Sequence, residues 1–275
     1  MERIVEVPGG RLNARMDGEG RPIVLAHAAI ANLHSWDRVV PGLVAAGFGV
    51  IRYDQRGFGE STTDDVEFDE RADLLAVMDA FGVTKAAVLG NSRGGHIGFD
   101  TAIVEPDRIV AVIALGSGPG GFDAGLTPVE RALFAEGEAL ESAATKDAAA
   151  LADLLVRVWV DGPGQPATRV DPAIRDLIHA ECLRLYAPGH VSGKRIPIDP
   201  PANDRLGELR CPVLAIAGGL DLAHMAKAAE RLAEAAPNAR AVVWPDVAHM
   251  IGMEQPDRLV DLVIEFLSPE GGKLS

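Results

Sequence analysis

A serine flanked by two glycines is the part of this sequence best suited to covalent chemistry. Gly90, Ser92 and Gly94 form the pattern Gly-x-Ser-x-Gly between an apolar run and a segment with helical spacing. A sharp turn from strand into helix strains the serine backbone and raises its hydroxyl above the sheet. Side chains at the two glycines would collide with neighbouring backbone. The pattern predicts that Ser92 is a nucleophile; the alternative is a serine that only caps the helix.

A serine nucleophile needs a base to accept its proton, and His249 is the best placed of the seven histidines. It follows the last apolar strand-like run, so its loop can bring the imidazole over the end of a sheet. His96 lies one helical turn beyond Ser92 and is expected to point away from the hydroxyl. His179 and His190 fall in a helical segment, where lone histidines usually pack or face solvent.

The base in turn needs an acid that orients it, and Asp221 follows a short apolar run at residues 213–217. The carboxylate should therefore lie at the same sheet edge as the serine and the histidine. Asp246 is the rival, but it stands only three residues from His249 and is better placed to brace that loop. His224, close after Asp221, either lines the pocket or begins a helix.

The elements that must position these residues alternate between short β-branched runs and longer amphipathic stretches. This alternation predicts a mostly parallel, eight-stranded sheet flanked by helices. We expect strands at residues 4–7, 12–16, 23–27, 49–53, 86–90, 109–115, 213–217 and 241–244, the first two forming an antiparallel hairpin. We expect helices at residues 36–46, 68–81, 92–104, 224–236 and 255–266.

One segment, residues 120–201, breaks the alternation because it shows helical patterns and no convincing strand. We expect helices there at residues 128–139, 147–160 and 172–186. A segment of this length is too long for a loop, so we interpret it as an inserted helical cap (lid). The core domain would then comprise residues 1–119 and 202–275, with the cap over the carboxyl edge of the sheet.

Composition excludes several classes of function. The chain has 275 residues, 48% of them hydrophobic, and a net charge of −14, which disfavours nucleic acid and anionic membranes as partners. No apolar run is long enough for a signal peptide or a membrane span, so we expect a cytoplasmic location. Cys182 and Cys211 lack metal-ligand spacing, and we expect neither a metal nor a cofactor. Whether the chain forms a homodimer stays open.

Four motifs together resemble those of the α/β-hydrolase superfamily, in particular its small bacterial serine esterases and enol-lactonases. The resemblance covers nearly the whole chain. The four motifs are the loop at residues 25–29 with Trp36, the turn at residues 53–61, the acid segment at residues 212–221 and the histidine segment at residues 248–256. The chain order Ser92, Asp221, His249 is the one that this fold uses.

The resemblance implies an oxyanion hole formed by the backbone N–H groups of Ala29 and Arg93. Ala28 stands where the family usually has glycine, which is tolerable if its φ is negative. His27 is expected to be a structural hydrogen-bonding residue. Asp54 and Arg56 are expected to brace the turn below the site.

The cap sequence around Trp159 also resembles this group, which implies that Trp159 lies near the pocket mouth; the alternative is a core residue of the cap. With His224 and Met250 it makes up the expected substrate-binding set. We expect a hydrolase that cleaves a small-molecule ester or lactone through an acyl-enzyme on Ser92. The same residues would also serve enol-lactone or carbon–carbon bond hydrolysis, or cofactor-free peroxidation.

Other readings are less well supported. Residues 116–121 match Gly-x-Gly-x-x-Gly, but no helix and no acid-ended strand follow, which argues against a dinucleotide site. The aspartate nucleophile of the family's dehalogenases and epoxide hydrolases is excluded by Ser92. A non-catalytic protein that only binds a ligand is a further alternative.

Overall fold

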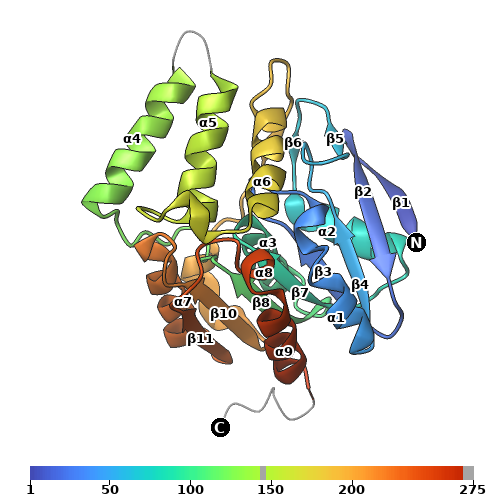
Figure 1. Cartoon of the computed structure of the whole chain (residues 1–275). Helices are drawn as coiled ribbons and strands as arrows, with labels where there is room; N and C mark the ends of the chain where they lie inside the picture. The colour runs from blue at the N-terminus through green and yellow to red at the C-terminus, as the bar shows by residue number, and fades with distance from the viewer. Residues whose placement is uncertain (143–146, 269–275) are drawn as a thin grey trace.

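The computed structural model describes residues 1–142 and 147–268; residues 143–146 of the expected cap and 269–275 of the expected core lie outside it. Within these ranges the fold is a mixed sheet covered by helices on both faces (Figure 1). The large sheet contains β1 (Glu2–Val7), β2 (Gly10–Asp17), β3 (Arg21–Ala26), β4 (Phe48–Tyr53), β5 (Thr62–Thr63), β7 (Ala86–Asn91), β8 (Ile109–Leu115), β10 (Val213–Gly218) and β11 (Ala239–Trp244).

The main path of this sheet has the order β1-β2-β4-β3-β7-β8-β10-β11. Pairing is antiparallel from β1 to β4 and parallel from β4 to β11. All eight expected strands are present within a few residues of their predicted ends. The sheet nevertheless has nine strands rather than eight, because β5 pairs with β2. A two-residue strand is too short to show any alternation, so its sequence does not reveal it.

Each parallel strand divides its side chains between two cores. In β3, Val24 and Ala26 pack on one face, while Ile23 and Leu25 pack on the other. This follows from the two-residue period of a strand, and it explains why these runs are apolar throughout. The first face is covered by α2 (Glu70–Ala80), α3 (Arg93–Val104) and α7 (Ala223–Ala235), the second by α1 (Val40–Ala45) and α9 (Pro256–Phe266).

Short elements complete the core region. A 3₁₀ helix, η1 (Leu33–Trp36), precedes α1, and α8 (Ile251–Glu254) precedes α9. Asp69 caps the start of α2 by accepting a hydrogen bond from the Arg71 N–H, 2.9 Å away. The helix expected at residues 36–46 is shorter than predicted: Trp36 belongs to η1, and α1 begins only at Val40, with Pro41 in its first turn.

The segment 120–201, called the helical insertion below, holds α4 (Pro128–Ser142), α5 (Ala148–Leu155), the π-helix η2 (Val156–Asp161), the 3₁₀ helix η3 (Ala167–Arg169) and α6 (Pro172–Leu185). Figure 1 shows α4, α5 and α6 side by side at one end of the sheet. The expectation that it contains no strand is wrong in one place. Its β9 (Lys194–Arg195) pairs in parallel with β6 (Glu67–Phe68), and η4 (Ala202–Glu208) then leads back to β10.

Candidate active site

Ser92 sits at the junction of β7 and α3 in a strained conformation. Its φ of 53° and ψ of −113° make it the one non-glycine residue with positive φ in the described part of the chain. Its side chain makes no capping hydrogen bond to α3, so the interpretation as a mere helix cap fails. A Cβ at Gly90 would lie 2.1 Å from the Gly94 carbonyl carbon, and one at Gly94 would lie 1.9 Å from the Ala26 oxygen. The two glycines are required for the steric reason that the sequence predicts.

His249 and Asp221 form a buried pair in the loops after β11 and β10. The Nδ1 atom of His249 lies 2.7 Å from Oδ2 of Asp221, and the side chains are 2% and 0% exposed. The other carboxylate oxygen of Asp221 accepts a hydrogen bond from the Leu222 N–H at 2.7 Å. Because an ionised carboxylate only accepts, the proton of a neutral His249 ring resides on Nδ1 and leaves Nε2 as an acceptor.

The serine turn and the histidine loop are joined by Asn91, which immediately precedes Ser92. Its amide Nδ2 donates to the carbonyl oxygens of His249 and Leu115, each at 3.1 Å. Sequence reasoning missed this tie, because it spans 158 residues and has no local signature.

Gly116, at the end of β8, lets the two halves of the site come close. It adopts a φ of +50°, and a Cβ there would lie 2.8 Å from Nδ1 of His249 and 3.1 Å from Oδ2 of Asp221. Gly116 also lines a cavity of about 290 Å³ together with Ser92. Among the hydrogen bonds of the described residues, none joins the Ser92 hydroxyl directly to the His249 ring. Such contacts are often long or misaligned without substrate and tighten when it binds.

The rival acid, Asp246, faces away from this arrangement. It forms an exposed ion pair with Arg258 at 3.0 Å. The histidine loop is braced instead by Glu254, whose Oε1 accepts from the Ala248 N–H at 2.9 Å and whose Oε2 pairs with Arg169 of the helical insertion. Glu254 was part of the family-like segment, but its tie to the insertion could not be predicted from sequence.

The expected oxyanion loop follows β3. The Gln55 N–H donates to Nε2 of His27 at 2.9 Å, so Nδ1 carries the proton and donates to the Ala28 carbonyl at 2.8 Å. Both ring nitrogens are thus used in fixed contacts, and burial lowers the pKa of His27. Ala28 does not have a positive φ, which satisfies the condition for alanine at this position. Ala29 follows it with an exposed side chain.

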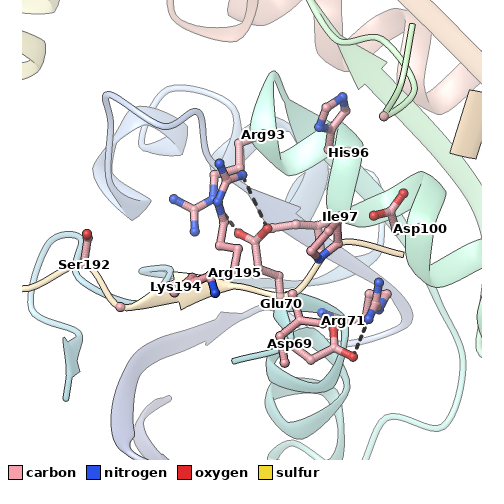
Figure 2. A pocket seen from close by; sticks show the side chains of 14 residues that line it. Asp69, Glu70, Arg71, Arg93, His96, Ile97, Asp100, Ser192, Lys194 and Arg195 are labelled. Atoms are coloured by element: carbon pink, nitrogen blue, oxygen red, sulfur yellow. Dashed lines mark hydrogen bonds and ion pairs between the residues drawn. The ribbon is translucent and has the colours of Figure 1, made fainter. Parts of the chain in front are cut away.

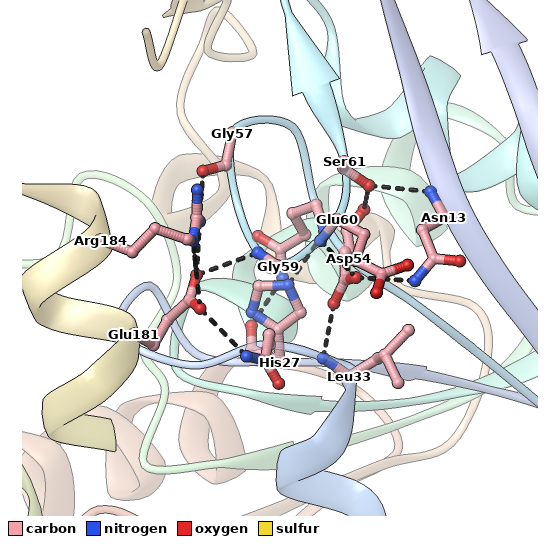
Figure 3. Close-up of polar contacts among 12 residues, drawn as sticks. Asn13, His27, Leu33, Asp54, Gly57, Gly59, Glu60, Ser61, Glu181 and Arg184 are labelled. Carbon is pink, nitrogen blue, oxygen red and sulfur yellow. Dashed lines mark hydrogen bonds and ion pairs between the residues drawn. The ribbon is translucent and has the colours of Figure 1, made fainter. Parts of the chain in front are cut away.

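The polar turn, residues 54–61 after β4, supports this loop (Figure 3). Asp54 accepts hydrogen bonds from the Leu33 N–H at 2.8 Å and from the Asn13 amide and the Glu60 N–H at 3.0 Å each. Arg56 donates two hydrogen bonds to Asp73, at 2.6 and 2.8 Å. Both residues therefore brace the turn, as expected.

An unpredicted contact ties the helical insertion to the same region. Glu181 on α6 accepts from the Asn32 amide and from the Gly59 N–H, each at 3.0 Å, and also pairs with Arg184 (Figure 3). Arg184 in turn donates to the Gly57 carbonyl at 2.7 Å. The insertion is thus fastened beside the expected oxyanion loop by the buried carboxylate of Glu181.

Three residues were expected to contact substrate, and the structure separates them. The centroids of the Trp159 and His249 rings lie 4.4 Å apart. Trp159 was expected at the pocket mouth, and the structure places it directly against the histidine ring. His224 lines the cavity beside Ser92; its Nδ1 is buried without a hydrogen-bond partner, and burial lowers its pKa. Met250 is not in the wall of this cavity but packs, 1% exposed, in an apolar cluster with residues of the insertion.

His96 departs from its expected position. It lines the same cavity as Ser92, where it was expected to point away, because α3 rises along the cavity wall. Burial lowers its pKa and so favours the neutral ring. The glycine-rich stretch after β8, dismissed as a dinucleotide motif, also contributes to the wall through residues 116–119.

No group of three or more His, Cys, Asp or Glu side chains in residues 1–142 and 147–268 is arranged to hold a metal ion. Every helix in these ranges is too short or too polar to cross a lipid bilayer.

The chain is similar to proteins that are named as hydrolytic or degrading enzymes. Rhodomycin D methylesterase DnrP of Streptomyces peucetius is 30% identical over 259 residues, covering 86% of this chain and 87% of that enzyme. Epoxide hydrolase B of Mycobacterium tuberculosis is 31% identical over 124 residues. This match covers 42% of this chain and only 35% of the length of that enzyme. The solved structure of Est816, described as an N-acyl homoserine lactone degrading enzyme, has a TM-score of 0.77 and 26% identity, covering 96% of this chain and 100% of that chain.

The family model of the α/β hydrolase fold matches residues 21–256. This range includes the serine turn, the acid loop and the histidine loop. The protein therefore belongs to the α/β hydrolase fold family.

Proposed function

We propose that this protein is a serine hydrolase that cleaves a carboxylic ester of a small molecule through an acyl-enzyme on Ser92. The observation that carries the proposal is the strained backbone of Ser92 at a strand–helix junction. A buried His249–Asp221 pair lies across Gly116 from it. Strain at a single non-glycine residue persists only where the surrounding structure enforces it, and such sites are typically functional.

In the proposed reaction, Nε2 of His249 takes the hydroxyl proton as Oγ of Ser92 attacks the carbonyl carbon. Asp221 holds the ring and stabilises the imidazolium that forms. The same proton then passes to the leaving alcohol, which leaves the acyl group on Ser92. Water attacks this ester with His249 again as base, releasing the acid and the free serine.

The developing oxyanion would be held by the backbone N–H groups of Ala29 and Arg93. Arg93 begins α3, where the first N–H groups of a helix have no partner within the helix. Donors of this kind typically contribute on the order of 10²–10³ in rate.

We assign residues 120–201 as a cap on a core made of residues 1–119 and 202–275. The ring contact of Trp159 with His249 and the Glu181 and Arg169 ties support this division. Trp159 and His224 would contact the substrate, while Met250 would act by packing behind the histidine. A lactone, as a cyclic ester, is the second candidate substrate, favoured by the overall similarity to Est816.

A fluorophosphonate probe tests the nucleophile. The wild type should be labelled at Ser92 and should hydrolyse short p-nitrophenyl esters. Ser92→Ala should lose both while keeping its unfolding midpoint. Ser117→Ala is the matched control, because Ser117 lines the same cavity but donates its hydroxyl to the Ser92 carbonyl at 2.7 Å.

The control variant should stay labelled. Labelling that persists in Ser92→Ala, or a folded wild type that neither reacts nor turns over any ester or lactone, would overturn the proposal.

A further inference from the structure

A second cavity, of about 620 Å³, adjoins the one beside Ser92 and shares Arg93 and His96 with it. It lies between the starts of α2 and α3 and the strand β9 at the end of the helical insertion (Figure 2). We call it the charged cavity. Its wall includes four basic side chains and three acidic ones: Arg71, Arg93, Lys194 and Arg195, with Asp69, Glu70 and Asp100. A local excess of basic groups stands out in a chain whose net charge is −14.

Two of the four cations already have carboxylates of their own. Arg71 pairs with Asp69 at 2.7 Å, and Lys194 pairs with Glu67 at 2.6 Å. These pairs leave Arg93 and Arg195, which both face Glu70.

One carboxylate is therefore shared by two guanidinium groups. Glu70 accepts a hydrogen bond from Nε of Arg93, and Nη1 of Arg195 lies 3.7 Å from its other oxygen. Figure 2 shows the two guanidinium groups side by side next to this carboxylate. Within the described residues, neither the Nη atoms of Arg93 nor any donor of Arg195 makes a hydrogen bond to protein. Arginine presents five N–H donors, so most of theirs remain unused.

The fold fixes the backbone that carries these donors, while the Arg195 side chain itself is 55% exposed. The β6–β9 pairing aligns Arg195 with Phe68, and the Lys194 and Ile196 N–H groups donate to the Val66 and Phe68 carbonyls at 2.8 Å each. Arg93 has its side chain only 11% exposed and lies over the Phe58 ring, 5.0 Å from its centroid. The free Nη donors of this largely buried guanidinium could form charge-assisted hydrogen bonds to an anionic ligand.

We propose that the charged cavity binds a carboxylate of the substrate between Arg93 and Arg195, so that the protein acts on half-esters of short dicarboxylic acids. This inference rests on the proposed function, since it names the substrate class of the Ser92 site. The planar fork of arginine matches a carboxylate in two-point contact, and Arg93 directly follows the nucleophile in sequence. An acyl chain attached to Ser92 can therefore direct its far end into this cavity.

Besides Asp69 and Glu70, which pair with arginines of the cavity, Asp100 is the acidic group that opposes an anion here. It lies on α3 with Oδ1 unpartnered, and burial raises its pKa to about 6. Its carboxylate lies one helical turn beyond His96, whereas Arg93 and Arg195 meet at Glu70. The anion is therefore assigned to the arginine pair and not to the Asp100 end of the cavity.

The test compares two esters that differ by one charge: mono-p-nitrophenyl adipate and methyl p-nitrophenyl adipate, each corrected for its enzyme-free rate. The wild type should prefer the charged ester in kcat/KM. Arg195→Gln should lower this preference about 10- to 100-fold, mainly through KM, because it removes a charge-assisted contact. Arg195→Lys should restore part of it.

Arg71→Gln is the matched control, since its charge is taken up by Asp69, and its preference should equal that of the wild type. An unchanged preference in Arg195→Gln, or a wild type that favours the methyl ester, would overturn the inference while leaving Ser92 catalysis intact. Calorimetry of adipate with Ser92→Ala gives a reading that needs no turnover. Binding that is equal in Ser92→Ala and in the double variant with Arg195→Gln would likewise refute the arginine site.

Discussion

The polar turn and the Ser92 cavity lie at the same edge of the sheet and use the same kinds of side chain in opposite ways. In and beside the turn, His27 uses both ring nitrogens, and Asp54 accepts three hydrogen bonds. Around the cavity, His249 has one ring nitrogen paired, and Nδ1 of His224 is buried without a partner. The two histidines His27 and His249 are equally buried, at 0% and 2% exposed, so the difference between them lies in hydrogen-bond saturation.

This contrast separates residues that hold the fold from residues that are available to a ligand. A buried polar group with all its partners stabilises one conformation, whereas an unsatisfied one costs free energy until something binds. Natural proteins retain such costs where function needs them. Substitutions in the turn should therefore reduce stability, and substitutions at the cavity should reduce activity.

The largest expected effect is on catalysis. His249→Gln should lower kcat by on the order of 10⁴-fold or more, because glutamine cannot accept and return the hydroxyl proton. Its urea midpoint should stay close to that of the wild type. Ester hydrolysis by the purified variant measures the effect, and Asp246→Asn, which alters the exposed neighbour pair with Arg258, is the control that should keep full activity. Activity retained in His249→Gln would contradict the comparison, because His249 would then be a structural residue like His27.

The next effect belongs to the polar turn. Arg56→Gln should reduce the free energy of unfolding by about 3–5 kcal/mol, because it leaves the Asp73 carboxylate buried without its charged partner. Urea denaturation measures this loss, and the folded fraction should keep its kcat. Arg205→Gln, which breaks an ion pair with the exposed Glu208, is the control and should leave the free energy of unfolding nearly unchanged, because surface ion pairs are screened by water. A loss of kcat without a loss of stability in Arg56→Gln would contradict the assignment of the turn.

The smallest effect concerns Asp100 in the charged cavity. Burial raises its pKa from 3.8 to about 6, so ionisation destabilises the folded state. Its contribution to stability is complete below the unfolded-state pKa and is lost as pH rises through about 6. Asp100→Asn should therefore match the wild type near pH 4 and be about 1 kcal/mol more stable at pH 8, after allowance for partial solvent screening. Urea denaturation at both pH values measures the difference; an equal gain at both would contradict the titration.

Much of the fold could be predicted because its signals are local. All eight strands of the main path could be predicted, for two different reasons: central parallel strands such as β8 are covered on both faces and read as apolar runs, whereas β1 and β2 form an antiparallel hairpin around a short turn. Thr62–Thr63 and Lys194–Arg195 were missed because two-residue strands exist only through their partners. The same limit explains why Met250 was misplaced: its burial depends on the helical insertion that packs against it.

The sequence by itself determined which residues could form a nucleophile, a base and an acid. Local residue types are enough to predict a strained strand–helix turn and to show that a residue directly follows a strand. Tertiary structure decided how they are held and what surrounds them. Asn91 reaching the His249 loop, Trp159 against His249, and Arg195 beside Arg93 each join segments far apart in the chain. Such contacts depend on how helices and strands pack as a whole, and no short stretch of sequence carries that information.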